Sequence, residues 1–227
     1  MINTNSLGIL GQFYFNIKES FKSIYQNSNF YEKKISKTFE NSFEYKPSPH
    51  LLSSIIKYQS KKYKIEDFAI ESIWQNKLSP KDYEKLNNFF WFFSLDLKSS
   101  KKTTQTVIKN WISNNTKYQK KSWEFDLTAK RIISWLSNHQ LTYEDSDQEY
   151  RTTFDHMIQK QTNHLLNEIK NPKEVENKMI GCAAIILTGL AYKNERQYLT
   201  YGLNLLKNII KSSICLLYTS DAADEVL

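Results

Sequence analysis

The apolar residues of this chain recur at helical spacing, and the pattern is densest between Phe89 and Leu136. A helix is predicted to begin at Ser79 and Pro80, because a serine at the N-cap bonds a free backbone amide and proline suits the first helical position. We expect this helix to run to about Leu97. The dense stretch also holds four of the five tryptophans, namely Trp91, Trp111, Trp123 and Trp135.

Two further helices are predicted in this stretch. The first ends near Asn114 and Asn115, and its apolar stripe consists of Val107, Ile108, Trp111 and Ile112. The second is predicted to be capped by Asp126 and has a broad apolar face formed by Leu127, Ile132, Ile133 and Leu136. Arg131 and Trp135 lie four residues apart in this helix, so we expect their side chains to be neighbours.

The N-terminal part of the chain predicts one clear helix. It spans about Leu7 to Asn27, with Phe13, Ile17, Phe21 and Ile24 in one stripe. Residues 28–66 are polar and interrupted by two prolines, so we expect an irregular entry segment with one short helix near Leu51 to Tyr58. A short extended piece is predicted at Phe68 to Ile73.

Three helices are predicted after the tryptophan-rich stretch. The first is capped by Asp147 or Ser146 and runs to about Ile169, with Tyr150, Phe154, Met157, Ile158, Gln161, Leu165 and Ile169 facing inward. The second spans about Glu174 to Tyr192. The third runs from Glu195 to about Lys211, with an apolar stripe of Leu199, Leu203, Leu206 and Ile210.

Composition agrees with an all-α fold. Five glycines and four prolines supply little turn chemistry for a β fold, and 40% hydrophobic residues in 227 are enough for one folded core. The predicted helices pair as hairpins about every 40 to 50 residues, a spacing typical of helical repeats. We therefore expect either an α/α toroid of hairpins, here incomplete, or an open α-solenoid.

The chain is basic, with a net charge of +7 and a pI near 9.1. Such a charge favours polyanions, including nucleic acid, anionic lipid and acidic polysaccharide. The lysines, however, are scattered in pairs, which also fits an ordinary lysine-rich surface. No nucleic-acid reading motif accompanies them, so we do not expect a nucleic-acid partner.

The sequence shows no pattern typical of a metal or cofactor site, and we expect none. Cys182 lies in an apolar helical run and is expected to be a small core residue. The histidines lack cysteine or carboxylate partners at ligand spacing; His156 and His164 could share a helix face, although solvated or capped histidines are commoner. We also expect no signal peptide and no membrane span, because no apolar run is long enough.

The order of the aromatic residues resembles a known family. The order begins with Trp91, Leu95-Asp96-Leu97 and a helix closing on Trp111, and continues with Trp123, which leads to Arg131, Ile132 and Trp135. It is similar to the N-terminal helical domain of bacterial heparinase II/III-like polysaccharide lyases. The resemblance covers most of the chain from about residue 60. It implies the α/α toroid.

The resemblance also implies an activity for the full-length parent protein. These lyases cleave acidic, uronic-acid-containing polysaccharides by β-elimination, in which a base removes the proton beside a neutralised carboxylate. In the family, the asparagine, tyrosine and histidine that perform this step come from later toroid helices and a C-terminal β-sandwich. We carry over no catalytic residue and expect this chain alone to be inactive. Family members are often periplasmic, but the sequence leaves the compartment open.

The candidate substrate-binding residues are Arg131, Trp135, Trp91 and Trp123. Aromatic faces stack on sugar rings, and arginine binds carboxylate or sulfate with two parallel hydrogen bonds. The alternative is structural, because tryptophans in helical bundles usually lie in the core and a neighbouring arginine often joins a buried hydrogen-bond network.

We expect three segments: residues 1–66 as N-terminal helix and irregular leader, 67–214 as partial toroid domain, and 215–227 as a non-native tail. The tail, CLLYTSDAADEVL, resembles a translated sequencing adapter, although a genuine acidic tail is the alternative. We therefore expect the natural sequence to continue differently after Ile214. The alternative to a lyase part is an α-helical repeat scaffold for protein interaction.

Overall fold

The computed structural model describes residues 4–36, 74, 79–95, 100–172, 174–192 and 196–224, and these residues form helices joined by turns. No β-strand occurs in these ranges, so the predicted all-α class is confirmed. The elements are α1 (Thr4–Gln26), α2 (Asn29–Ile35), α4 (Pro80–Asn87), the 3-10 helix η3 (Phe90–Ser94), α5 (Lys101–Asn114), α6 (Phe125–Ser137), α7 (His139–Thr142), α8 (Gln148–Glu168), α9 (Val175–Ala191) and α10 (Arg196–Asp224).

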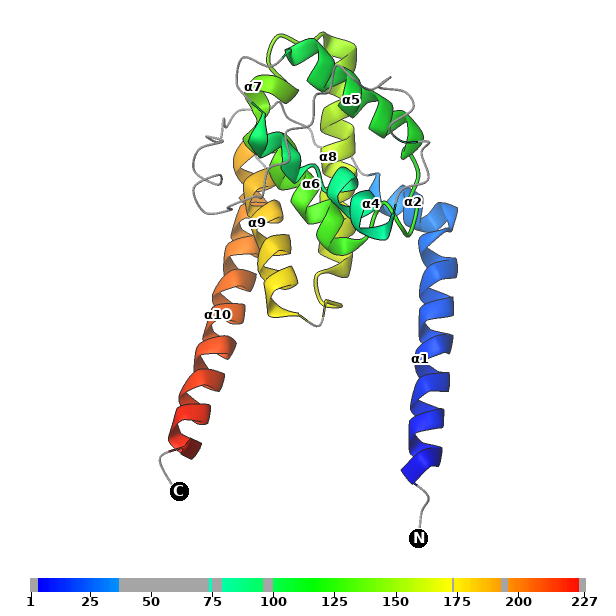
Figure 1. Ribbon diagram of the computed structural model, residues 1–227, viewed down its shortest axis with the longest axis vertical. Coiled ribbons are helices and arrows are strands. Elements are labelled where there is room, and N and C mark those ends of the chain that lie inside the picture. The colour runs from blue at the N-terminus through cyan, green and yellow to red at the C-terminus, as the bar shows by residue number, and fades with distance from the viewer. Residues whose placement is uncertain are drawn as a thin grey trace.

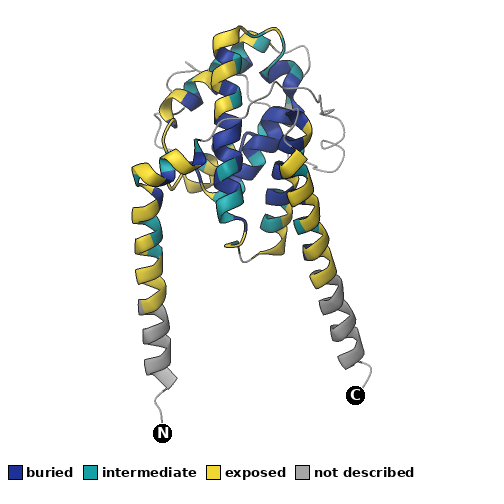
Figure 2. Cartoon of the chain, turned by 180° about the vertical axis from the view of Figure 1, so that it is seen from behind, coloured by how far each residue is buried: buried dark blue, intermediate teal, exposed yellow. Residues whose placement is uncertain are grey.

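Helix α6 is the centre of the helical body. It contacts α8 and α9 and is also covered by α4, η3 and α7, and α9 in turn pairs with α10 (Figure 1). The most deeply buried residues gather on these central helices (Figure 2). Helices α1 and α10 both extend beyond the body toward the same end of the molecule (Figure 1). The arrangement of the helices as hairpins of an α/α toroid stays a prediction.

An aromatic cluster around Phe89 joins α4, α5 and α6. The Phe89 ring lies 5.2 Å from that of Trp135 and 6.2 Å from that of Trp111, edge to face in both cases. It also stacks on Trp74 and Trp91, at 5.6 and 5.9 Å between ring centroids. Edge-to-face and stacked pairs at these distances add to the stabilisation that burial provides. The tryptophan-rich stretch is therefore the core of the fold.

Several helix limits follow the predictions. Ser79 caps α4 by accepting a hydrogen bond from the Asp82 amide, with Pro80 at the first position, and Asp147 caps α8 by accepting one from the Tyr150 amide at 2.7 Å. The stripe predicted for α5 and the inward set predicted for α8 are buried throughout. Cys182 is buried in α9. Local capping chemistry and apolar spacing were sufficient for these elements.

Two limits in the dense stretch were predicted wrongly. The helix from Ser79 ends at Asn87 rather than at Leu97, because Phe89 adopts a left-handed backbone conformation with φ 59°. The Asn88 side chain then accepts a hydrogen bond from the Phe90 amide, at the start of the 3-10 helix. Asp126 does not cap α6, since Glu124 holds that position and Asp126 instead bonds Lys130 at 2.8 Å.

Other elements differ from the prediction in extent. Helix α10 continues to Asp224, past the predicted end at Lys211 and into the segment predicted to break the helical pattern. Helix α2 lies in the stretch that was predicted to be irregular, and α7 was not predicted. The short helix at 51–58 and the extended piece at 68–73 lie outside the described residues, and the segment boundaries stay predictions. In the ranges described above, no helix is long and apolar enough to cross a membrane.

The left-handed backbone at Phe89 gives a stability prediction. A bulky residue in this conformation is strained by about 1 to 2 kcal/mol, a strain that glycine does not have. Replacing Phe89 by alanine or by glycine removes the same ring, so both variants should lose about 3 to 5 kcal/mol through lost packing. We expect Phe89→Gly to be about 1 kcal/mol more stable than Phe89→Ala in urea unfolding. Equal stability of the two variants would show that the backbone here is unstrained.

Candidate functional site

Arg131 is completely buried beneath the aromatic cluster. Its Nε donates to Gln161 Oε1 of α8 at 2.8 Å, and one terminal nitrogen donates to the Asn87 carbonyl of α4 at 2.8 Å. The other terminal nitrogen donates to the Ser122 carbonyl at 3.1 Å and to the Thr128 hydroxyl at 3.2 Å. The guanidinium therefore joins α4, the segment before α6, and α8.

The guanidinium also lies over the indole of Trp111, 3.9 Å from the ring centroid, an arrangement that stabilises a desolvated cation. Burial lowers the pKa of Arg131 to about 9, so the group remains charged at neutral pH. Trp111 is itself fixed by a 2.9 Å hydrogen bond from its indole nitrogen to Asn87 Oδ1. Arg131 is thus held by neutral oxygen acceptors and an aromatic face.

These positions favour the structural interpretation of two predicted binding residues. Arg131 and Trp135 have no exposed surface with which a sugar could make contact. Trp135 packs against Trp111 and Phe154 at 5.6 and 5.5 Å between ring centroids. Trp91 is half-buried and donates to the Leu86 carbonyl at 3.3 Å. Of the four candidates, Trp123 alone lines the pocket described next.

A pocket of about 600 Å³ lies between α1, the segment before α6, the end of α8 and the start of α9. Helix α1 contributes polar residues, and the segment before α6 contributes Tyr118, Lys120, Lys121 and Trp123. His164 and Glu168 of α8 complete the inner wall. Elements that are far apart in the sequence therefore meet here.

His164 is buried in the pocket wall, and its ring nitrogens both have partners. One partner is the Trp123 carbonyl, 2.8 Å from Nε2, and because a carbonyl only accepts, Nε2 carries the proton. The Tyr31 hydroxyl then donates to Nδ1 at 2.6 Å. Burial lowers the pKa of His164 to about 4, opposed in part by Glu168 and by the bond to the Trp123 carbonyl. His164 is therefore a neutral positioning group that fixes the Trp123 backbone.

A second set of hydrogen bonds attaches α1 to the pocket. The Tyr118 hydroxyl donates to Gln26 Oε1 at 2.8 Å, and Gln26 Nε2 donates to Glu168 Oε1 at 2.9 Å. Glu168 also forms an ion pair with Lys22 and accepts from Asn171 at 2.9 Å. Burial raises the pKa of Tyr118 to about 12, so this phenol stays protonated.

No family model, curated protein or solved structure matches this chain. The geometry of the pocket therefore carries the functional argument.

Trp123 lines the pocket with a largely buried side chain. Its side chain is buried, and its indole nitrogen has no hydrogen-bond partner among the residues that the structure describes. A buried N–H without a partner costs stability, and the indole nitrogens of Trp74 and Trp135 are unpaired in the same way. Lys120 is exposed nearby, and Lys121 lies over the Tyr83 ring at 4.1 Å. Burial raises the pKa of Glu124, with Asp126 and Glu84 adding to the effect.

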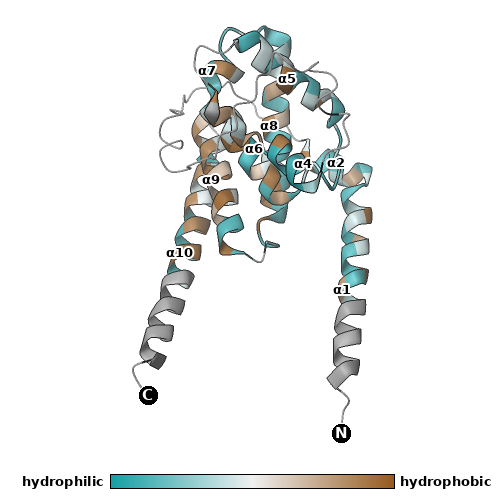
Figure 3. Cartoon of the chain, viewed as in Figure 1, coloured by the Kyte–Doolittle hydropathy of each residue, from teal (hydrophilic) through white to brown (hydrophobic). Residues whose placement is uncertain are grey.

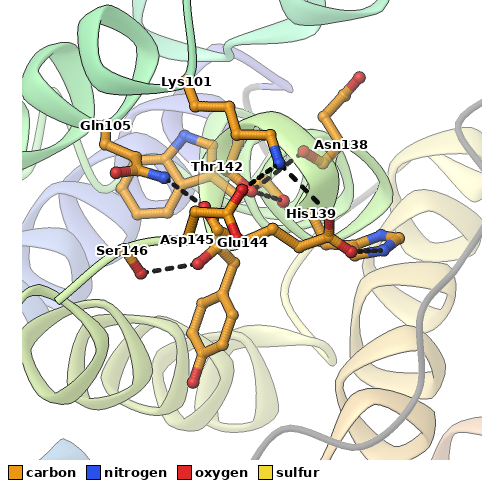
Figure 4. A network of polar contacts seen from close by, with 10 residues as sticks. Lys101, Gln105, Asn138, His139, Thr142, Glu144, Asp145 and Ser146 are labelled. Atoms are coloured by element: carbon orange, nitrogen blue, oxygen red, sulfur yellow. Dashed lines mark hydrogen bonds and ion pairs between the residues drawn. The ribbon is translucent and has the colours of Figure 1, made fainter. Parts of the chain in front are cut away.

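A second polar cluster follows the C-terminal end of α6, where α5 meets the turn after α7 (Figure 4). Lys101 donates to Asp145 at 2.6 Å and lies 3.5 Å from Glu144, which itself lies 3.4 Å from His139. The Gln105 side chain donates to the Glu144 backbone carbonyl at 2.9 Å. These bonds hold the turn against α5. In the described part of the chain, no group of three His, Cys, Asp or Glu side chains could hold a metal ion.

Sequence reasoning missed most of the pocket. His156 and His164 do not share a face, because His156 is exposed while His164 is buried. The sequence contains no recognisable motif at Tyr118, Gln26 or Glu168, because these residues come together only through packing. The one usable signal was Trp123, which the aromatic pattern identified.

The buried guanidinium predicts a strong difference between two conservative substitutions. Arg131→Lys should lose at least about 3 kcal/mol, because lysine cannot reach acceptors in three directions and leaves buried carbonyls unpaired. Arg151→Lys is the matched control at a half-exposed position and should change stability by less than about 1 kcal/mol. Chemical denaturation measures both; a loss below about 1 kcal/mol for Arg131→Lys would contradict the structural role.

His164 predicts a specific dependence of stability on pH. Its pKa is lowered from 6.5 to about 4 by folding, so the unfolded chain takes up the proton first as the pH falls. The contribution of neutral His164 is therefore fully present above pH 6.5 and is lost as the pH falls toward 4. The stability difference between wild type and His164→Gln should shrink by about 3 kcal/mol across this window. A constant difference would show that His164 titrates normally.

Proposed function

We propose that this chain is part of the helical domain of a heparinase II/III-like polysaccharide lyase and that its pocket binds an acidic, uronic-acid-containing polysaccharide. The observation that carries the proposal is the pocket of about 600 Å³, which is lined by lysines, carboxylates, amides and aromatic side chains. The order of tryptophans and Arg131 that resembles this family supports the same assignment.

The mixed lining of the pocket suits a sugar better than a nucleic acid. Carboxylate and amide groups such as Glu19, Gln26 and Asn177 can bond sugar hydroxyls, and Tyr118 and Phe125 supply aromatic surface. Lys120 and Lys121 can pair with a uronate carboxylate. Massed lysines would be needed to follow a phosphate backbone, whereas here Glu124 and Asp126 lie beside the lysines.

The same geometry favours binding without cleavage. β-Elimination needs a base that can take a proton from the sugar, and such a group must have a free acceptor within hydrogen-bond reach. Both ring nitrogens of His164 are occupied by Tyr31 and Trp123. The resemblance assigns the catalytic groups of the family to regions outside the matched stretch, so we propose that this chain alone is inactive.

An interaction scaffold is the second candidate. It is favoured by the large apolar side chains that α1 exposes to solvent, including Tyr14, Phe21 and Ile24. Extended apolar surface on a folded protein commonly marks a protein interface. The two candidates use different faces of α1 and can be tested separately.

Calorimetric titration with heparan sulfate and alginate oligosaccharides tests the sugar-binding proposal. We expect at least one of these uronate polymers to bind, with dextran binding more weakly because it lacks carboxylates. Lys120→Gln and Lys121→Gln each remove an exposed charge at the pocket. Each should weaken binding by about 5- to 10-fold, which corresponds to the loss of one hydrogen bond or charge contact.

Lys102→Gln is the matched control, because Lys102 is also exposed but lies on α5 away from the pocket. It should leave the affinity unchanged. If Lys102→Gln and Lys120→Gln weakened polysaccharide binding equally, the binding would come from general electrostatic attraction and not from the pocket. Absence of binding to either polymer, or release of unsaturated uronate products by the chain, would contradict the proposal.

A further inference from the structure

Helix α1 has an unusual orientation for an amphipathic helix. Glu19, Lys22, Ser23 and Gln26 recur at helical spacing and face the pocket, where Lys22 and Gln26 bond Glu168. Surface helices normally turn an apolar stripe toward the core and polar residues toward water. Here the polar residues of α1 face the protein body.

The apolar residues of α1 lie on the other side of the helix. At about 100° per residue, the stripe of Tyr14, Ile17, Phe21 and Ile24 is about half a turn from the pocket-facing residues. Tyr14, Phe21 and Ile24 are 71%, 70% and 69% exposed. Figure 2 shows most of the described length of α1 as exposed, and Figure 3 shows hydrophobic and hydrophilic positions interspersed along it. None of the described residues covers this stripe.

The spacing of the stripe indicates what kind of surface fits it. Apolar residues occur at positions 7, 10, 14, 17, 21 and 24, which alternate steps of three and four. This is the a/d pattern of a left-handed coiled coil, in which one helix packs its knobs into the holes of another. A helix with the same spacing is therefore a partner that fits this stripe.

The charges along α1 are compatible with a second copy of the same helix. Lys18, Glu19 and Lys22 are the charged residues of α1, and Glu19 and Lys22 lie on the pocket side. In a parallel pair, Lys18 at an e position faces position 13 of the other copy, which is a phenylalanine in the sequence. No like charges meet across this seam, and the two bodies lie on its outer sides.

The area available also suits a modest dimer. The exposed parts of Tyr14, Ile17, Phe21 and Ile24 amount to about 500 Å² per copy, judged from the usual surface of such side chains. A pair would bury about 1,000 Å², the lower limit for a specific interface. Interfaces of this small size are typical of transient complexes, so we expect a dimer that dissociates on dilution, in the micromolar range, rather than a permanent one.

We propose that the apolar stripe of α1 is a self-association surface, through which two copies of this chain pair as a parallel two-stranded coiled coil. The proposal does not depend on the sugar-binding proposal, because the pocket uses the opposite face of the helix.

Sedimentation equilibrium of the full 227-residue chain over a range of concentrations tests this proposal. The wild type should shift from monomer to dimer as its concentration rises. Phe21→Glu places a charge in the seam and should weaken dimerisation at least about 100-fold. Circular dichroism should show that the variant keeps its helical content.

Phe30→Glu is the matched control, since Phe30 is 69% exposed on α2 and lies outside the stripe. The Phe30→Glu variant should dimerise with the same dissociation constant as the wild type. A wild type that stays monomeric at about 100 μM, well above the expected micromolar dissociation constant, would overturn the proposal. Equal weakening by Phe21→Glu and Phe30→Glu, or assembly larger than a dimer, would also overturn it.

Discussion

The interaction on which the rest of this structure depends is the burial of the Arg131 guanidinium between Trp111 and four oxygen acceptors. A cation removed from water without a carboxylate beside it is costly unless nearly all of its donors are satisfied. The protein meets this condition with neutral groups from α4, α8, the segment before α6 and α6 itself. Because the acceptors in α4, in α8 and in the segment before α6 come from different parts of the chain, the guanidinium fixes their relative positions in a way that apolar packing alone does not.

The same constraint shapes the pocket. Arg131 holds the Ser122 carbonyl and His164 holds the next carbonyl, that of Trp123. Two consecutive peptide groups are therefore fixed from within, which positions the Trp123 indole in the pocket wall. On the other side, Gln26 and Lys22 attach α1 through Glu168. Polar bonds thus hold the pocket together, and those made by α1 turn its polar side inward and leave its apolar stripe exposed.

Local rules predicted much of the fold. Ser79 and Asp147 could be identified as caps because capping depends on a few neighbouring residues, and the buried set of α8 followed from spacing alone. The break at Phe89 could not be predicted, since a left-handed phenylalanine is stable only inside the surrounding aromatic cluster. The side-by-side placement of Arg131 and Trp135 suggested a site, yet only their burial distinguishes a structural arginine from a binding one. The pocket residues come from four distant segments and have no local signature.

The buried guanidinium can be observed directly by hydrogen exchange at the arginine side chain, measured by nuclear magnetic resonance on the intact chain. The account predicts that the Arg131 Nε–H exchanges as slowly as the core amides of α6, because it is released only when the core opens. The Nε–H of Arg196, which is exposed on α10, supplies the fast reference. If the Arg131 proton exchanged as fast as that of Arg196, the guanidinium would be accessible to water, and the account of this fold would be wrong.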